Sequence, residues 1–137
     1  MGRKFVSHLH SALLQAQVKT FINEENQHGE MKLEEHMRAI AGSKIAIIVF
    51  SKTYTESIRC LRELEKIIEC YQTFGQIVLP VFYEIHRFDV KDDFGKELEE
   101  AAQKSYSGEQ LERVLSRWSR ALTTAVGISG LDVRDFR

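Results

Sequence analysis

Apolar residues follow two different periods along this chain, and the alternation of the two predicts its fold class. Some stretches have apolar residues three and four positions apart, the period of an amphipathic helix. Shorter runs between them are almost continuously apolar or rich in β-branched and aromatic residues, which is typical of buried strands. The expected helices cover residues 4–17, 32–41, 56–74, 93–104 and 109–126, and the expected strands cover residues 18–22, 44–50, 77–83 and 128–132. This order predicts an α/β protein with a mostly parallel sheet.

The stretch from residue 45 to residue 64 joins the most apolar strand to a polar loop and then to a charged helix. Open α/β sheets place their ligands at the carboxyl ends of strands, so a functional site is expected here. Ser51 follows the strand directly, and Glu63 lies on the helix. Glu63 has two interpretations at this point. It is either a carboxylate of the site or a solvated residue of a charged helix face, as most glutamates are.

The only proline, Pro80, lies inside the apolar run 77–83. Proline has no amide hydrogen to donate to a strand ladder, so this position is expected at a sheet edge or a bulge. Gly42 and Gly75 follow two of the expected helices and are expected to end them.

Composition narrows the function classes. The chain has 137 residues, enough for one domain with a substantial core, and its formal net charge is -1. A general nucleic-acid-binding role would need a basic excess, and no apolar run is long enough to span a membrane. The histidines show no metal-ligand spacing, so neither a metal nor a prosthetic group is expected.

The two cysteines, Cys60 and Cys70, both fall on the expected helix 56–74. Ten residues of helix span about 15 Å, which is beyond the reach of a disulfide. We therefore expect reduced thiols and a cytoplasmic location, with a nuclear one as the alternative.

Five segments together resemble the Toll/interleukin-1 receptor (TIR) domain of plants, as it occurs in nucleotide-binding leucine-rich-repeat disease-resistance proteins. They are KFVSHLHSAL, VKTFIN, VFSKTYTESIRCLRELEKIIEC, GQIVLPVFYEI and SRWSRALTTAVGISGLDVRDF. The most specific pattern is F-S-K-x-Y-x-x-S-x-x-C-L-x-E-L. The resemblance covers nearly the whole chain and implies one TIR domain over residues 1–137, with a flavodoxin-like three-layer α/β/α fold.

The resemblance also implies an activity. Many plant TIR domains cleave NAD+ to nicotinamide and ADP-ribose products, linear or cyclic, and act after self-association. The family's catalytic glutamate corresponds to Glu63, and NAD+ would be a substrate rather than a bound cofactor. Ser51, Cys60 and Gly29 match positions expected to bind the substrate. Purely structural roles are also open for these three: a turn residue, a small buried apolar group and a loop glycine.

For self-association, the resemblance points to the pair Ser7 and His8 on the first expected helix, although an exposed pair without a role would look the same. The expected partners are other TIR domains and NAD+, with no membrane and no nucleic acid.

The chain departs from the family pattern at both ends. The family's first strand, with the loop that lines one wall of the NAD+ pocket, has no counterpart ahead of Arg3, and the last helix is also missing. Strands 18–22 and 44–50 would then each lack a neighbour. Three outcomes are open: the two strands pair directly, a strand from another chain fills the gap, or the fold is weakened. Inside the specific pattern, Arg59 stands where the family usually has tryptophan.

These departures leave three functional hypotheses. In the first, the chain is an NAD+ glycohydrolase of plant immune signalling. In the second, it is a non-catalytic adaptor or decoy that binds other TIR domains. In the third, it is a fragment, and the longer protein from which it comes supplies the missing strand.

Overall fold

The structure, a computed structural model, describes residues 2–25, 32–85 and 87–132. The described strands form one parallel four-stranded sheet in the order β1-β2-β3-β4. In chain order the elements are α1 (Gly2–Gln15), β1 (Thr20–Asn23), α2 (Leu33–Ala41), β2 (Ile45–Phe50), the short 3-10 turn η1 (Tyr54–Glu56), α3 (Ile58–Phe74), β3 (Ile77–Phe82), α4 (Arg87–Gln103), α5 (Gly108–Val126) and β4 (Leu131–Asp132).

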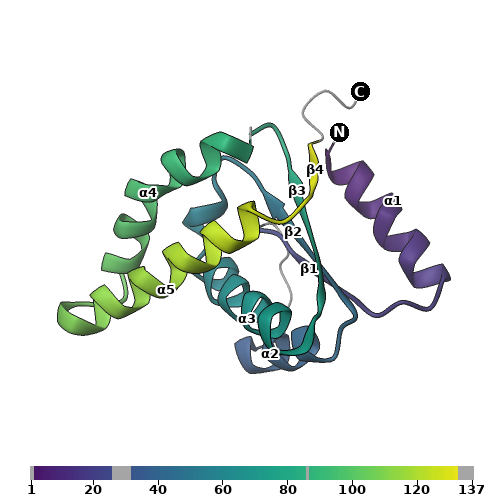
Figure 1. The fold of residues 1–137 in the computed structure, drawn as a ribbon, viewed down its shortest axis with the longest axis horizontal. Coiled ribbons are helices and arrows are strands. Elements are labelled where there is room, and N and C mark those ends of the chain that lie inside the picture. The colour runs from purple at the N-terminus through teal and green to yellow at the C-terminus, as the bar shows by residue number, and fades with distance from the viewer. Residues whose placement is uncertain (1, 26–31, 86, 133–137) are drawn as a thin grey trace.

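Three layers result, with the sheet in the middle. Helix α1 covers one face, at the right of Figure 1, and helices α2, α3 and α5 cover the other face. Helix α4 packs outside them, against α5 and η1. This arrangement confirms the expected flavodoxin-like α/β/α fold. Among the described helices, none combines the length and the apolar character needed to cross a bilayer.

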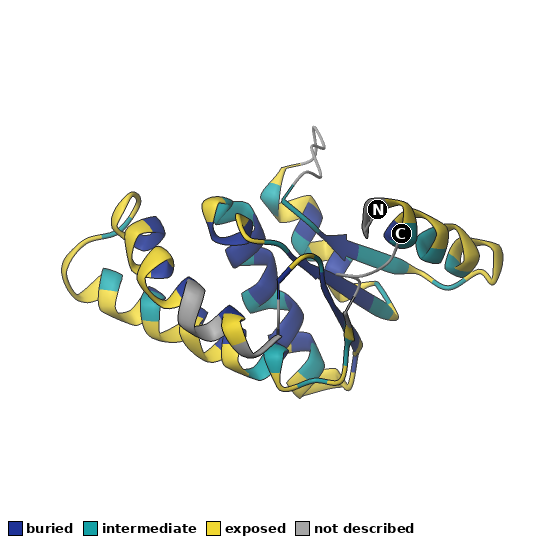
Figure 2. Cartoon of the chain, turned by 90° about the horizontal axis from the view of Figure 1, so that it is seen from above, coloured by how far each residue is buried: buried dark blue, intermediate teal, exposed yellow. Residues whose placement is uncertain are grey.

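Strand β2 is the centre of the core because it is apolar on both faces. Ala46, Ile48 and Phe50 point to the side of α3 and α5, whereas Ile47 and Val49 point to α1. Alternate residues of a strand face opposite sides, so a continuous apolar run is what a doubly covered strand needs. Figure 2 shows the strands of the sheet mostly in dark blue and teal, and the exposed residues on the outer sides of the helices in yellow.

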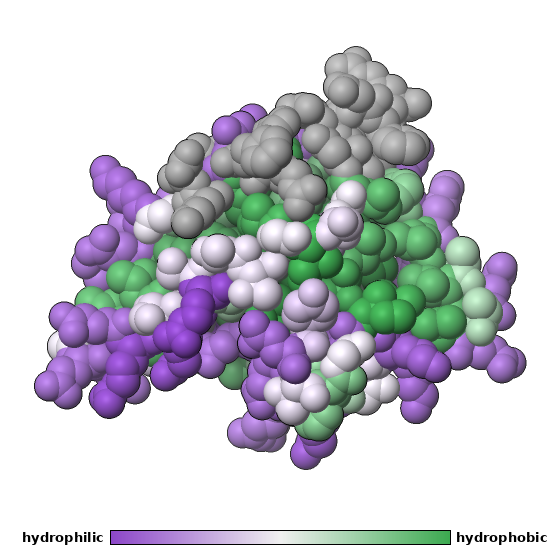
Figure 3. All heavy atoms as spheres, in the orientation of Figure 1, coloured by the Kyte–Doolittle hydropathy of each residue, from purple (hydrophilic) through white to green (hydrophobic). Residues whose placement is uncertain are grey.

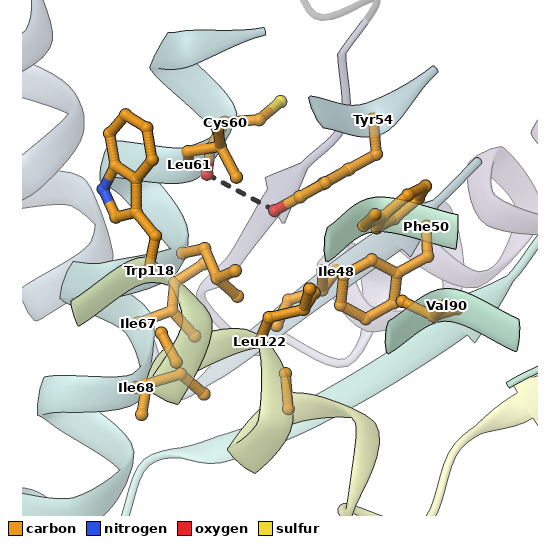
Figure 4. Packing of buried hydrophobic residues seen from close by; sticks show 14 of the residues in the cluster. Ile48, Phe50, Tyr54, Cys60, Leu61, Ile67, Ile68, Val90, Trp118 and Leu122 are labelled. Carbon is orange, nitrogen blue, oxygen red and sulfur yellow. Dashed lines mark hydrogen bonds between the residues drawn. The ribbon is translucent and has the colours of Figure 1, made fainter. Parts of the chain in front are cut away.

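The larger part of the core lies between the sheet and helices α3 and α5. In Figure 4 Trp118 and Leu122 of α5 lie in one cluster with Leu61, Ile67 and Ile68 of α3, and the indole of Trp118 extends on the side of Leu61. In the space-filling view, hydrophobic residues gather in the middle of the face between α5 and α1, and hydrophilic residues gather toward the outline (Figure 3).

The two strands that were expected to lack a neighbour pair with each other. The register runs from Thr20 opposite Ile45 to Asn23 opposite Ile48. Of the three outcomes left open by the sequence, the structure therefore has direct pairing. Asn23, the last residue of β1, is consequently held beside β2 and close to the start of α3.

Pro80 lies within β3 but interrupts no ladder to β2. The amides of Ile77 and Tyr83 donate to main-chain carbonyls at the two ends of β2. Alternate residues of a strand present their amides to opposite edges, so the ring nitrogen of Pro80 faces β4. Within the described part of the chain, β4 pairs with Val81 and Phe82 and does not reach Pro80. The expected edge strand or bulge was therefore wrong: Pro80 lies in the regular register of an internal strand, at a point beside which the described part of β4 does not extend.

Most expected boundaries agree with the structure within two residues, but strand β4 begins at Leu131 rather than at residue 128. Helix α4 begins at Arg87 rather than at residue 93. The expected helix 56–74 begins only at Ile58, because Glu56 ends η1 and Ser57 is extended, with its hydroxyl accepting a hydrogen bond from the amide of Cys60. This is ordinary N-cap chemistry. The end of α3 was predicted correctly, since Gly75 has φ 69°, and both cysteines are free thiols.

A glycine near the end of the chain tests the packing of β4 on β3. A Cβ atom on Gly130 would lie 2.3 Å from the main-chain oxygen of Pro80, so alanine there must displace one of the two backbones. We expect Gly130→Ala to lower the free energy of unfolding in urea by about 1–3 kcal/mol. Gly95 of α4 is the control, because a Cβ atom added there would have no described neighbour within 4 Å. Gly95→Ala should be neutral or slightly stabilising, and equal losses in the two variants would contradict this account.

Candidate functional site

The site lies where β1 ends and α3 begins. The N-cap at Ser57 sets the direction of α3, and one turn and a half later the helix presents Glu63 toward the end of β1. The Glu63 side chain is 0% exposed. A carboxylate that is fully removed from water must be hydrogen-bonded or paired with a cation, and Glu63 is both.

Three side chains from three elements surround the Glu63 carboxylate. The Asn23 amide nitrogen donates to Oε1 at 2.9 Å. On Oε2, the Arg59 Nη1 donates at 2.7 Å and the His36 Nδ1 lies at 2.6 Å. Because an ionised carboxylate only accepts hydrogen bonds, the proton of the histidine contact belongs to Nδ1. Glu63 thus joins β1, α2 and α3 through short, charge-assisted contacts.

A second set of hydrogen bonds fixes Asn23 itself. Its amide nitrogen also donates to the carbonyl of Cys60 at 3.2 Å, and its amide oxygen accepts from the hydroxyl of Tyr54. The Tyr54 hydroxyl lies 3.3 Å from the same Cys60 carbonyl, the contact drawn as a dashed line in Figure 4. Burial raises the pKa of Tyr54 well above its ordinary value, so the hydroxyl stays protonated as a donor. These bonds hold the end of β1 against the first turn of α3.

Arg59 covers the side of Glu63 that is nearest to solvent. Its side chain is 27% exposed, whereas that of His36 is 8% exposed. Its second guanidinium nitrogen, Nη2, donates to the main-chain carbonyl of Glu24 at 2.8 Å and lies 3.8 Å from the sulfur of Cys60. Burial raises the pKa of the Cys60 thiol to about 12, so this cysteine is not a nucleophile in the described arrangement.

A cavity of about 360 Å³ opens beside this cluster at the carboxyl ends of β2 and β3. Its lining residues are Glu24, Glu25, Val49, Ser51, Lys52, Thr53, Tyr83 and Glu84. The hydroxyl of Ser51 donates to the Glu25 carboxylate at 2.6 Å, and the Thr53 hydroxyl donates to the same oxygen. Arg59 connects the cavity wall to Glu63, because it bonds both the backbone of Glu24 and the carboxylate.

The structure brings some of the predicted site residues together and separates others. Ser51 lines the cavity, and Glu63 and Cys60 lie buried beside it, outside the lining. Ser7 and His8 are exposed on α1, on the opposite face of the sheet from α3. Gly29 lies outside the described residues. The interpretation of Glu63 as a solvated helix residue was wrong, because its side chain has no exposed surface.

Three members of the cluster were missed as site residues in the sequence. Arg59 and Glu63 are four residues apart on one helix, a spacing that allows an ion pair and could have been noticed. Asn23 ends a strand, where parallel sheets place ligand groups, and this too was a usable signal. His36 gave no signal, because its role depends on the packing of α2 against α3.

Comparison with known proteins identifies the family. A sequence model of the TIR domain matches residues 2–137. The chain is 36% identical over 135 residues to a probable disease resistance protein, RPP1, of Arabidopsis thaliana, with 98% of the chain and 11% of that protein covered. It is 37% identical over 134 residues to the disease resistance protein RUN1 of Vitis rotundifolia, with 96% of the chain and 10% of that protein covered. The chain therefore spans about a tenth of the length of these relatives.

A solved structure agrees with the sequence matches. The TIR domains in the structure of the activated Roq1 resistosome, which directly recognises the pathogen effector XopQ, superpose with a TM-score of 0.71 at 37% identity. The match covers 96% of this chain and 80% of that one. Sequence and fold lead to the same conclusion: this chain belongs to the TIR domain family.

Proposed function

We propose that this TIR domain acts in plant immune signalling by cleaving NAD+ after association with other TIR domains, with Glu63 as the catalytic residue. The observation that carries the proposal is the placement of Glu63. Its carboxylate lies at the carboxyl end of a parallel strand, where such sheets bind their ligands. It is beside a cavity and is oriented by Asn23 and His36. The relatives of this chain among plant disease resistance proteins support the signalling role.

The chemistry requires little more than a fixed negative charge. In NAD+ the bond between C1′ of the ribose and the nicotinamide nitrogen breaks, and the electron pair leaves with neutral nicotinamide. The ribose then carries positive charge, much as the sugar does in glycoside hydrolysis, and a carboxylate stabilises that charge. Water adds to C1′ and releases a proton, which completes ADP-ribose. Asn23 and His36 would hold Glu63 in one orientation for this step.

Substrate must reach Glu63 for this chemistry, and in the described arrangement Arg59 and the backbone of Glu24 stand on the route from the cavity. The proposal therefore includes an open arrangement, in which the cavity at the strand ends extends to the carboxylate. Ser51 already lines this cavity and would face the bound nucleotide. Its hydroxyl would exchange the Glu25 carboxylate for a polar group of the substrate.

Association is the second part of the proposal. The matched TIR domains of Roq1 belong to an activated resistosome, which supports an assembly of TIR domains here as well. In this chain the exposed pair Ser7 and His8 on α1 is the expected contact surface, since both side chains are free of the core.

A second candidate function is a non-catalytic adaptor that binds other TIR domains. The complete burial of Glu63, and its position outside the cavity lining, favour this candidate. In that case the polar cluster serves the fold alone, and the association surface is the functional part of the molecule.

Substitutions of two glutamates on α3, Glu63 and Glu65, distinguish the two candidate functions. We expect the wild-type chain, concentrated with a crowding agent, to release nicotinamide from NAD+, and Glu63→Gln to lower the rate at least about a hundredfold. Glu65→Gln is the control, because Glu65 is partly exposed on the same helix and pairs with Arg117. Nicotinamide is quantified by chromatography, and thermal unfolding shows that the variants are folded. Wild-type release no greater than that of Glu63→Gln would exclude catalysis.

The association surface is tested separately. We expect His8→Ala to weaken self-association by about tenfold if His8 lies near the centre of an interface. Gln15→Ala is the control, because Gln15 is exposed on the same helix farther along. Light scattering across a range of concentrations gives the dissociation constants. Unchanged association in His8→Ala would remove this surface from the proposal, whereas association without NAD+ cleavage would support the adaptor.

A further inference from the structure

Arg59 differs from the other groups that bond Glu63 in two ways. Asn23 is fully buried and His36 nearly so, but the Arg59 side chain keeps 27% of its surface exposed. Arg59 also contacts the chain on the far side of the site, through the carbonyl of Glu24. Among the described contacts of Glu63, the guanidinium is therefore the one that water or a ligand can reach and displace.

The energetic balance of Glu63 depends on this residue. A buried ion pair contributes little net stability, but removing one partner leaves an uncompensated charge, which is strongly unfavourable. With Arg59 displaced, the described contacts that remain are that of Oε2 with His36 and that of Oε1 with Asn23. A carboxylate in that state gains by turning toward water, and the path that Arg59 has vacated is available to it.

We propose that Arg59 is a latch: a positioning residue that holds Glu63 closed against the backbone at Glu24 and whose release opens the route from the cavity to the carboxylate. The inference rests on the proposed function, because it assigns the regulation of the same carboxylate. The latch joins two segments far apart in sequence, the first turn of α3 and the backbone at Glu24. Its opening starts with the rotation of one partly exposed side chain.

Cys60 supplies a built-in reporter of this opening that does not depend on catalysis. Its sulfur lies 3.8 Å from Nη2 of Arg59, and its side chain is fully buried. Burial raises the pKa of the thiol to about 12, so alkylation in the closed arrangement is slow. Cys70 is also a buried free thiol, but it lies near the other end of α3, beside Phe74 and Gln76. It reports on general loosening of the fold.

The experiment measures iodoacetamide labelling of each cysteine by mass spectrometry, in the full chain. We expect Arg59→Ala to increase the labelling rate of Cys60 by about tenfold or more while that of Cys70 stays unchanged, because a buried charge has lost its partner. Arg59→Lys should give a smaller increase, since lysine keeps the charge but not the paired donors. Arg62→Ala is the control, because Arg62 lies on the same helix and bonds Tyr106 instead.

A double variant separates a latch from simple packing. If the charge of Glu63 drives the opening, Arg59→Ala should have a much smaller effect on Cys60 in the Glu63→Gln background. Cys60 labelling no faster than in Arg62→Ala would overturn the proposal. Equal acceleration at Cys60 and Cys70 would also overturn it, because Arg59 would then support the whole fold.

Measuring NAD+ cleavage on the same samples keeps the two proposals apart. Selective exposure of Cys60 in Arg59→Ala without nicotinamide release confirms the latch and contradicts the catalytic role of Glu63. Nicotinamide release by the wild-type chain without any selective change at Cys60 in Arg59→Ala supports catalysis and contradicts the latch.

Discussion

A carboxylate without access to water must find its hydrogen bonds inside the protein, and around Glu63 this requirement organises one end of the molecule. The three groups that satisfy it come from β1, α2 and α3. Each of these elements also packs through apolar residues, but apolar contacts tolerate small shifts more readily than a bond of 2.6–2.9 Å does. The polar cluster therefore fixes the relative positions of elements that the apolar core brings together.

The pairing of β1 with β2 makes this cluster possible. Because Thr20 lies opposite Ile45, the strand ends with Asn23 opposite Ile48, at the level of the first turn of α3. A shift of one residue would turn the Asn23 side chain to the opposite face of the sheet, since successive side chains alternate. The register of two apolar strands, set by the core, thus decides which polar side chain meets the buried carboxylate.

The sequence predicted the elements well and the site only in part. Continuous apolar runs and helical periods identify β2, β3 and the helices because those patterns follow from local geometry. Glu63 was singled out by its place in a family pattern, but its burial could not be foreseen. Whether a charged residue on an amphipathic helix is solvated depends on what the opposite element presents. In this fold β1 presents Asn23 and α2 presents His36, and Arg59 comes from the same helix as Glu63.

The same reasoning explains why the start of α4 was misplaced while Gly75 was located correctly. A glycine at a positive φ ends a helix for a local reason that can be read from one residue. The first turn of α4 has weak apolar periodicity and is held by its neighbours, since Val90 and Phe94 are buried in the core with Tyr54. Tertiary contacts of this kind leave little trace in a single sequence.

The interactions that stabilise this end of the fold also keep the Glu63 carboxylate, the proposed catalytic group, away from solvent. Arg59 contributes to both effects. In the closed arrangement it compensates the charge of Glu63 and connects α3 to the backbone at Glu24, just after β1. Any state in which Glu63 meets a substrate must give up these contacts and recover their free energy from the substrate or from a partner domain. If Glu63 is the catalytic group, the same ion pair that stabilises the fold also lowers activity, because it keeps the carboxylate from the substrate. The bound state can be favoured only by as much as its ligand prefers the open arrangement.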